Sequence, residues 1–166
     1  MMIELTHLYR SPGHDFFGRH GKGREEHAIE SCDTLELVAG SGIVGDRFFD
    51  YKPDYKGQIT FFEESVYEAV KSEFNLPELS SSAFRRNVIV RGVELDSLIG
   101  RHFAIGDIEF TGSEESKPCY WMDEACAPGV EEFLRGRGGL RARILTSGTL
   151  TKGRHDLTLL GDIPVT

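Results

Sequence analysis

The sequence predicts a mainly β protein, a β-barrel with a few short peripheral helices. Short apolar runs bounded by turn residues recur along the chain, and only two or three windows carry the apolar spacing of a helix. Strands do not alternate with long helices, as they would in a parallel βαβ sheet. The 166 residues contain no linker, repeat or low-complexity tract, so a single domain is expected over residues 1–166.

Strands are expected wherever apolar and β-branched residues run between turns. Those runs cover residues 3–10, 28–38, 58–62, 87–90, 140–146 and 157–160. The clearest local signal is a hairpin over residues 103–110, in which Gly106 and Asp107 join two alternating runs. Two polar stretches, residues 13–24 and 48–57, are expected to be loops.

The main helix is expected over residues 63–74. Its apolar positions fall on one helical face, and they are Val66, Tyr67, Val70 and Phe74. Shorter helical segments are expected near the middle and the end of the chain. These are a turn over residues 95–99, a helical turn over 120–127 and a short helix over 129–134.

Charge and cysteine usage exclude several classes of protein. A formal net charge of −8 argues against unspecific binding to nucleic acid or to an anionic membrane. The first residues lack the basic and apolar regions of a signal peptide, and no run approaches the roughly 18 apolar residues of a membrane span. Cys32, Cys119 and Cys126 are odd in number and irregularly spaced, which disfavours a disulfide framework. A cytoplasmic, reducing location is therefore expected.

Familiar catalytic motifs are missing from the sequence. No zinc site is expected, because there is no CxxC pair and the six histidines show neither HExxH nor HxH spacing. Without a Walker A motif, a GxGxxG opening a helix or a GxSxG, the kinase, Rossmann and serine-hydrolase classes are excluded. His20 is kept as a candidate site-lining residue, with a surface position as the alternative. Asp46 is expected to tie its turn to Arg47.

Cys119 is the strongest candidate for chemistry. Pro118 precedes it and a helical turn is expected to follow, so unpaired N–H groups could stabilise its thiolate. A thiolate is what a nucleophile, a persulfide carrier or a soft metal ligand requires. The alternative is a buried apolar cysteine. Cys126 could resolve an oxidised Cys119, although core packing is the other interpretation, and Cys32 is expected to be structural.

Arginine gathers in two stretches of this acidic chain, at residues 85–101 and 135–143. Guanidinium groups hold phosphate oxygens bidentately, so both stretches are candidates for an anion pocket, with solvated surface arginine as the alternative. Arg85, Arg86 and Asn87 stand immediately before a strand and can point into the mouth of a barrel, unless Asn87 caps a turn between two surface charges. The glycines at 136, 138 and 139 would let a phosphate approach backbone N–H groups, or they form a plain loop.

The barrel topology suggests where these candidates meet. Strands remote in sequence deliver their ends to one mouth of a closed barrel. We therefore expect Cys119 to lie near Arg86, Asn87 and the turn at residues 139–143. We also expect it to be open to solvent, with positive side chains and few carboxylates around it.

Four motifs occur in an order that resembles the MOSC domain, named for the C-terminal domain of molybdenum-cofactor sulfurases. Residues 42–47 read GIVGDR, 84–92 read FRRNVIVRG, 117–119 read KPC and 135–143 read RGRGGLRAR. The resemblance runs from about residue 26 to about residue 153. Segment 54–58 departs from it, because the histidine that the family often carries there is absent.

The resemblance implies a β-barrel that binds the molybdenum cofactor, a molybdopterin, or carries sulfur for it. Cys119 would be the catalytic and metal-ligating residue. The residues expected to bind the cofactor are Arg85, Arg86, Asn87, Tyr120, Gly138, Gly139, Arg141 and Arg143. No pyridoxal phosphate is expected in this chain. Three roles stay open: a sulfur carrier supplied by a cysteine desulfurase, a reductase of N-hydroxylated compounds fed by an electron-transfer protein, and a module that stores or delivers the cofactor. The fourth alternative is a relative that shares only the fold and has kept no ligand.

Overall fold

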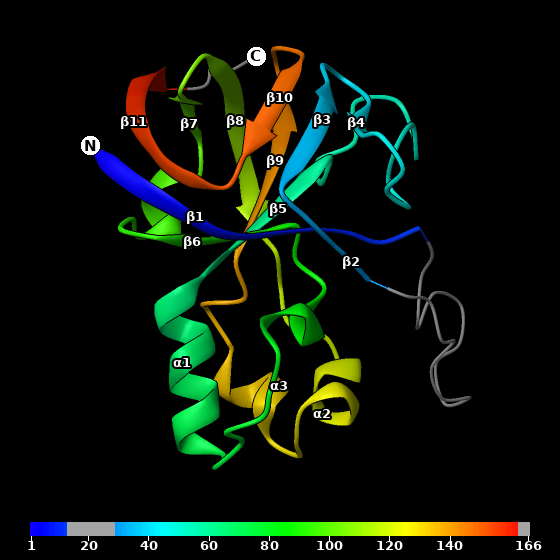
Figure 1. Ribbon diagram of the computed structural model, residues 1–166, viewed down its shortest axis with the longest axis vertical. Coiled ribbons are helices and arrows are strands. Elements are labelled where there is room, and N and C mark those ends of the chain that lie inside the picture. The colour runs from blue at the N-terminus through cyan, green and yellow to red at the C-terminus, as the bar shows by residue number, and fades with distance from the viewer. Residues whose placement is uncertain (13–28, 163–166) are drawn as a thin grey trace.

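The core of the computed structural model, which describes residues 1–12 and 29–162, is a seven-stranded β-barrel (Figure 1). Its strands follow the order β11-β7-β8-β9-β5-β6-β1, and pairing between β11 and β1 closes the ring. They are β1 (Met2–Arg10), β5 (Ile59–Glu63), β6 (Val88–Arg91), β7 (Arg101–Ile105), β8 (Ile108–Glu115), β9 (Leu140–Ile144) and β11 (Gly153–Asp162). The expectation of a mainly β barrel is confirmed.

A small second sheet and five helical segments complete the described chain. The sheet has the order β10-β3-β4, while β2 (Glu30–Cys32) pairs with the end of β1. Its strands are β3 (Thr34–Val38), β4 (Gly42–Ile43) and β10 (Gly148–Thr151). The helices are α1 (Glu64–Glu73), α2 (Trp121–Ala125), α3 (Val130–Phe133) and two 3-10 turns, η1 (Ser81–Phe84) and η2 (Leu95–Leu98). None of the helices within residues 1–12 and 29–162 is both long and apolar enough to cross a membrane.

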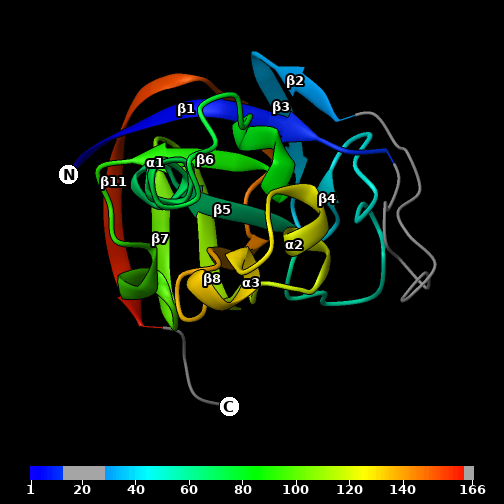
Figure 2. The ribbon, with the colours of Figure 1, turned by 90° about the horizontal axis from the view of Figure 1, so that it is seen from below.

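Strand β5 separates two apolar clusters. Consecutive strand residues point to opposite faces, so Phe61 faces the barrel interior and Phe62 faces the helices. Inside the barrel, the Phe61 ring packs edge-on against Phe103 and Phe110, with centroids 6.4 and 5.7 Å away. On the other side, Phe62 stacks on Phe84 at 4.7 Å. Figures 1 and 2 show α1, α2 and α3 gathered on this same side of the barrel.

Most elements match the sequence predictions, and the differences have local causes. The hairpin at Gly106 and the helix after β5 lie where expected, with α1 one residue shorter at each end than residues 63–74. The expected strand over 28–38 is divided at Asp33 into β2 and β3. Strand β10 was not predicted, because its sequence, GTLT, has a single large apolar residue and no apolar run. The expected loop over residues 13–24 lies outside the described residues.

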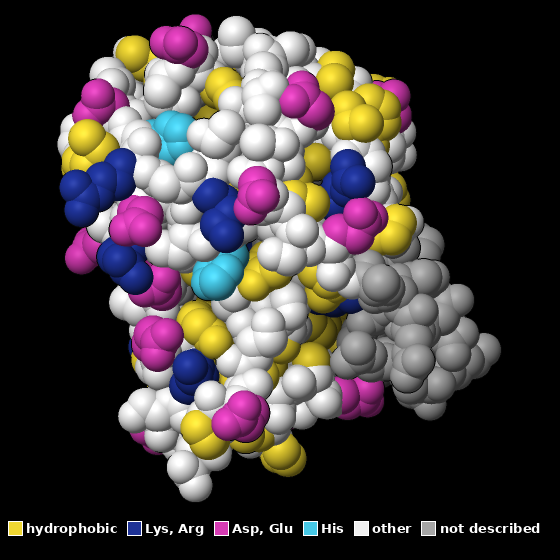
Figure 3. Space-filling model, viewed as in Figure 1, with side chains coloured by type: hydrophobic (Ala, Val, Ile, Leu, Met, Phe, Trp, Pro, Cys, Tyr) yellow, Lys and Arg dark blue, Asp and Glu magenta, His cyan; other side chains and the backbone are white. Residues whose placement is uncertain are grey.

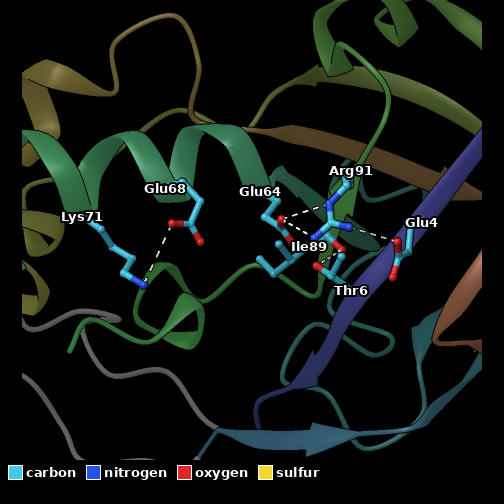
Figure 4. A network of polar contacts seen from close by, with 7 residues as sticks. All are labelled: Glu4, Thr6, Glu64, Glu68, Lys71, Ile89 and Arg91. Atoms are coloured by element: carbon cyan, nitrogen blue, oxygen red, sulfur yellow. Dashed lines mark hydrogen bonds and ion pairs between the residues drawn. The ribbon is translucent and has the colours of Figure 1, made fainter. Parts of the chain in front are cut away.

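Charged side chains of both signs are interspersed over the face shown in Figure 3. One such group joins α1, β1 and β6 (Figure 4). Arg91 places Nη2 2.7 Å from Glu64 and Nη1 3.1 Å from Glu4, and Thr6 donates to the carbonyl of Ile89.

We expect Arg91→Gln to leave the midpoint of thermal unfolding within about 2 °C, because ion pairs of a largely solvated arginine contribute little. The Arg91 side chain is 59% exposed. A thermal melt followed by circular dichroism checks this, and a fall of many degrees would mean that the network holds the barrel together.

Candidate functional site

Cys119 lies on the connection between β8 and α2, where it is exposed to solvent. Its Sγ is 3.9 Å from the carbonyl oxygen of Lys117, and its own carbonyl accepts the N–H of Met122 as the helical turn begins. Helix α2 has five residues and carries Asp123 and Glu124 in its first turn. The helix therefore offers a thiolate little stabilisation, but a positive charge lies near the segment that carries the thiol.

That charge comes from Arg86, which is 6% exposed. Its guanidinium donates to four backbone carbonyl oxygens, of Phe84 (3.1 Å), Ser116 (2.9 Å), Lys117 (3.5 Å) and Gly138 (3.0 Å). Lys117 is two residues from the thiol, so Arg86 lies directly behind the segment that presents Cys119. These four hydrogen bonds go to uncharged carbonyls, so they bring no counter-charge.

Burial lowers the pKa of Arg86 to about 10; Cys119 raises it, Arg47 and Arg141 lower it further, and Glu115 raises it. These interactions require the charged groups to be close in space. We call Arg47, Arg86, Arg141 and Cys119 the arginine–thiol cluster. Arg86 remains protonated at neutral pH, because a pKa of about 10 is still well above 7.

Arg141 and Arg143 point outward from β9 toward the loop at residues 48–57 and already have partners there. Arg141 places Nη1 3.1 Å from Glu114 and donates through Nη2 to the hydroxyl of Tyr55 at 3.0 Å. Arg143 lies 2.9 Å from the carboxylate of Asp54. Glu114 and Asp54 thus pair with these two arginines and Glu115 lies near Arg86, so the region holds more carboxylates than expected.

Arg85 and Asn87 turn away from the thiol. Arg85 adopts a left-handed conformation with φ 56°, and its Nη2 donates to the hydroxyl of Ser11. The Asn87 amide donates to the carbonyl of Tyr9 (3.1 Å) and to Asp46 (3.3 Å), and its oxygen accepts the N–H and hydroxyl of Thr60 (both 3.0 Å). Asn87 therefore joins β1, β5 and the Asp46 turn, using its amide hydrogen-bonding capacity within the protein.

Asp46 has a wider role than the tie to Arg47 expected from the sequence. Its Oδ1 accepts the N–H of Ser11 at 2.8 Å, and its Oδ2 accepts the N–H of Phe48 at 3.2 Å. The arrangement holds the long loop against the end of β1. His20, the other polar candidate, lies outside the described residues.

Gly138 and Gly139 are glycines because the chain is crowded there. A Cβ on Gly138 would meet the Ser116 carbonyl oxygen at 2.3 Å, and one on Gly139 would meet the Phe61 carbonyl oxygen at the same distance. The N–H of Gly138 donates to the Glu115 carboxylate at 3.1 Å, so a protein anion already holds the position where a phosphate was expected. Tyr120, next to the thiol, is half-buried at the start of α2.

A group of packed aromatic rings lies beside the arginine–thiol cluster, and it could not be predicted from sequence. Tyr51 and Tyr55 pack with ring centroids 4.9 Å apart, and Phe48 lies 5.3 Å from Tyr55. Arg47 lies over the Phe48 ring at 4.9 Å and Arg141 lies 5.5 Å from the Tyr55 ring. The arginines thus lie against π faces as well as beside carboxylates.

The described residues contain no group of three or more His, Cys, Asp or Glu side chains that could hold a metal ion. Cys119 can add one soft donor.

We expect Cys119 to alkylate faster than Cys32 and Cys126 near neutral pH, because only the thiolate reacts. Burial raises the pKa of Cys126 to about 11, with Asp123 acting in the same direction, and burial also raises that of Cys32, which Arg10 partly offsets. Limited iodoacetamide treatment and mass mapping would show the order. Labelling of either other cysteine first would contradict the assignment of Cys119.

Slow labelling of Cys126 should persist until the pH approaches 11. The ordinary pKa is 9.0, so the folded state favours the neutral thiol. The contribution of Cys126 to the free energy of unfolding is therefore fully present below pH 9.0, and it is lost as the pH rises through about 11.

The MOSC domain sequence profile matches residues 43–155, more than half of the chain. The chain belongs to the MOSC domain family, which confirms the resemblance and relates the protein to the molybdenum cofactor. A search of curated proteins finds no match.

Solved structures share the fold. The YuaD protein of Bacillus subtilis superposes with a TM-score of 0.76 at 18% identity, and the match covers 96% of each chain. YiiM from Geobacillus stearothermophilus gives 0.69 at 13% identity, covering 95% of this chain and 75% of that one. YiiM from Escherichia coli gives 0.68 at 17% identity, covering 98% and 71%. At these identities the likeness shows the fold alone.

Proposed function

We propose that this protein binds the molybdenum cofactor at the arginine–thiol cluster, with Cys119 as the protein's ligand to the metal. The observation that carries the proposal is the exposed thiol of Cys119 in front of the buried cation Arg86, whose hydrogen bonds within the described residues go to uncharged carbonyls. A protonated guanidinium without a paired carboxylate favours an anion close by. A thiolate and an anionic cofactor both meet that condition.

The donor set fits such a group. A thiolate is a soft ligand of the kind that suits molybdenum, and a pterin cofactor supplies the remaining sulfur ligands itself. Arg141 is the cation that we propose for the cofactor's phosphate, because its side chain is 33% exposed and its partner Glu114 is 41% exposed. Arg143, 26% exposed, is a second candidate. When bound, the metal supplies redox chemistry, while the protein residues hold the cofactor and orient it.

Sulfur carriage is a second candidate, favoured by the position of Cys119 on an exposed connection that a protein donor can reach. A cysteine desulfurase persulfide would give its outer sulfur to the Cys119 thiolate. One S–S bond would form at Cys119, the donor's S–S bond would break, and the donor would leave as a thiolate. We propose a cytoplasmic setting for either role, consistent with three free thiols.

Metal and pterin analysis of protein purified from a molybdate-replete host tests the proposal. Stoichiometric molybdenum together with pterin is expected. Turnover of an N-hydroxylated compound with an added electron-transfer protein would assign the reductase role, and cofactor without turnover would assign storage or delivery. Protein that contains neither molybdenum nor pterin, even after incubation with released cofactor, would refute cofactor binding; cyanide-labile sulfur on Cys119 would then support sulfur carriage.

A further inference from the structure

The guanidinium of Arg86 donates its hydrogen bonds to backbone carbonyl oxygens. A guanidinium carries five N–H donors. Nε donates to Gly138, Nη1 to Phe84, and Nη2 to both Ser116 and Lys117. No hydrogen bond or ion pair within residues 1–12 and 29–162 joins Arg86 to a carboxylate. With four bonds made, no edge of the guanidinium offers the pair of parallel donors that a phosphate fork needs.

The four carbonyls belong to three segments that are separate in sequence and converge on this side chain. Phe84 ends η1, Ser116 and Lys117 lead from β8 to Cys119, and Gly138 leads into β9. The last two segments are also joined directly, since the N–H of Ser116 donates to the carbonyl of Gly139 at 2.8 Å.

At this junction of the three segments, the backbone at Gly138 and Gly139 lies close to the connection that carries Cys119. A Cβ on Gly138 would lie 2.8 Å from Cδ of Pro118 as well as 2.3 Å from the Ser116 carbonyl oxygen. One on Gly139 would lie 3.5 Å from Nε of Arg86. The connection carrying Cys119 therefore lies directly against the backbone that leads into β9.

We infer that Arg86 is a positioning residue, which fixes the segment that presents Cys119 by joining it to η1 and β9 and does not itself grip the ligand's phosphate. The inference deepens the proposed function and rests on it for its meaning in ligand binding. Removal of the guanidinium would leave four carbonyls without their donor and free residues 116–119 to move. The phosphate contact is thereby left to arginines that reach solvent.

The mobility of a nitroxide attached to Cys119 tests the inference directly. Cys32→Ser and Cys126→Ser leave one thiol for labelling, and electron paramagnetic resonance reports how freely it moves. In Arg86→Gln, measured well below the unfolding midpoint, the correlation time should shorten by about twofold or more, because the anchoring bonds are lost. Arg86→Lys, with fewer and shorter-reaching donors, should fall between the two.

Two further variants separate position from charge and from global stability. Gly138→Ala keeps the guanidinium but forces the junction apart, and it should also mobilise the label. Arg91→Gln makes the same chemical change at an exposed ion pair and should leave the spectrum unaltered. Should Arg86→Gln fail to fold, the spectra of Arg86→Lys and Gly138→Ala decide.

An unchanged spectrum in folded Arg86 variants, accompanied only by a lower unfolding temperature, would overturn the inference. Failure of the proposed function looks different. Wild-type protein would then bind no cofactor, while the mobility of the label would still depend on Arg86.

Discussion

Replacing Cys119 with serine is expected to abolish molybdenum and pterin loading while leaving the barrel intact. A hydroxyl is a poor donor to a soft metal and cannot carry a persulfide. The fold should not suffer, because the side chain is exposed and its one described polar contact is a 3.9 Å approach to the Lys117 carbonyl. Molybdenum would be measured by mass spectrometry and pterin by fluorescence after oxidation. The unfolding midpoint should stay within about 2 °C of wild type.

Cys32→Ser is the matched control, since it makes the same change at a cysteine of β2, outside the cluster, and should retain full loading. Full loading of Cys119→Ser would remove Cys119 from the site. A large fall in its unfolding temperature would instead mean that the sulfur packs in the core.

The largest loss of stability is expected at the centre of the barrel. Phe61→Ala should lower the free energy of unfolding by about 3–5 kcal/mol, as large-to-small changes of buried aromatics do. Phe61 is 1% exposed, and its ring packs edge-on against the stacked rings of Phe103 and Phe110. Urea denaturation followed by fluorescence would measure the loss.

Leu145→Ala provides the comparison, because this side chain follows β9 and is 44% exposed; a change within about 0.5 kcal/mol is expected. If Phe61→Ala does not fold, Phe61→Leu should still be measurably less stable than wild type. A loss at Phe61 no larger than that at Leu145 would contradict the packing of the barrel core.

The sequence predicted the elements better than their assembly. Period-two alternation located the hairpin at Gly106, and the helical apolar face located α1, because both signals are local. Closure of the barrel depends on pairing between β1 and β11, which lie at opposite ends of the chain, such as Met2 with Asp156. No local pattern encodes such a contact. The short β4 is likewise set by its pairing with β3.

The candidate site could also be predicted only in part, because local motifs identify single residues and do not show how those residues are arranged. Motifs in the sequence identified Cys119 and Arg86, and the structure brings both into one cluster. Residue type could not separate Arg86, directed at the thiol segment, from Asn87, directed at Asp46, since neighbours in an extended chain point to opposite sides. The glycines at 138 and 139 suggested a phosphate nest, yet only three-dimensional crowding explains them. Arg47 was expected only as the partner of Asp46 in its turn, whereas the structure places it near Arg86.

Selenium absorption spectroscopy would test the assignment of Cys119 as the metal ligand most directly. With Cys32 and Cys126 replaced by serine, incorporation of selenocysteine places the single absorbing atom at position 119. In protein loaded with the cofactor, the fine structure at the selenium edge should contain a molybdenum neighbour in addition to the residue's own carbon. A spectrum with carbon alone, from protein that demonstrably holds the cofactor, would contradict Cys119 as the ligand.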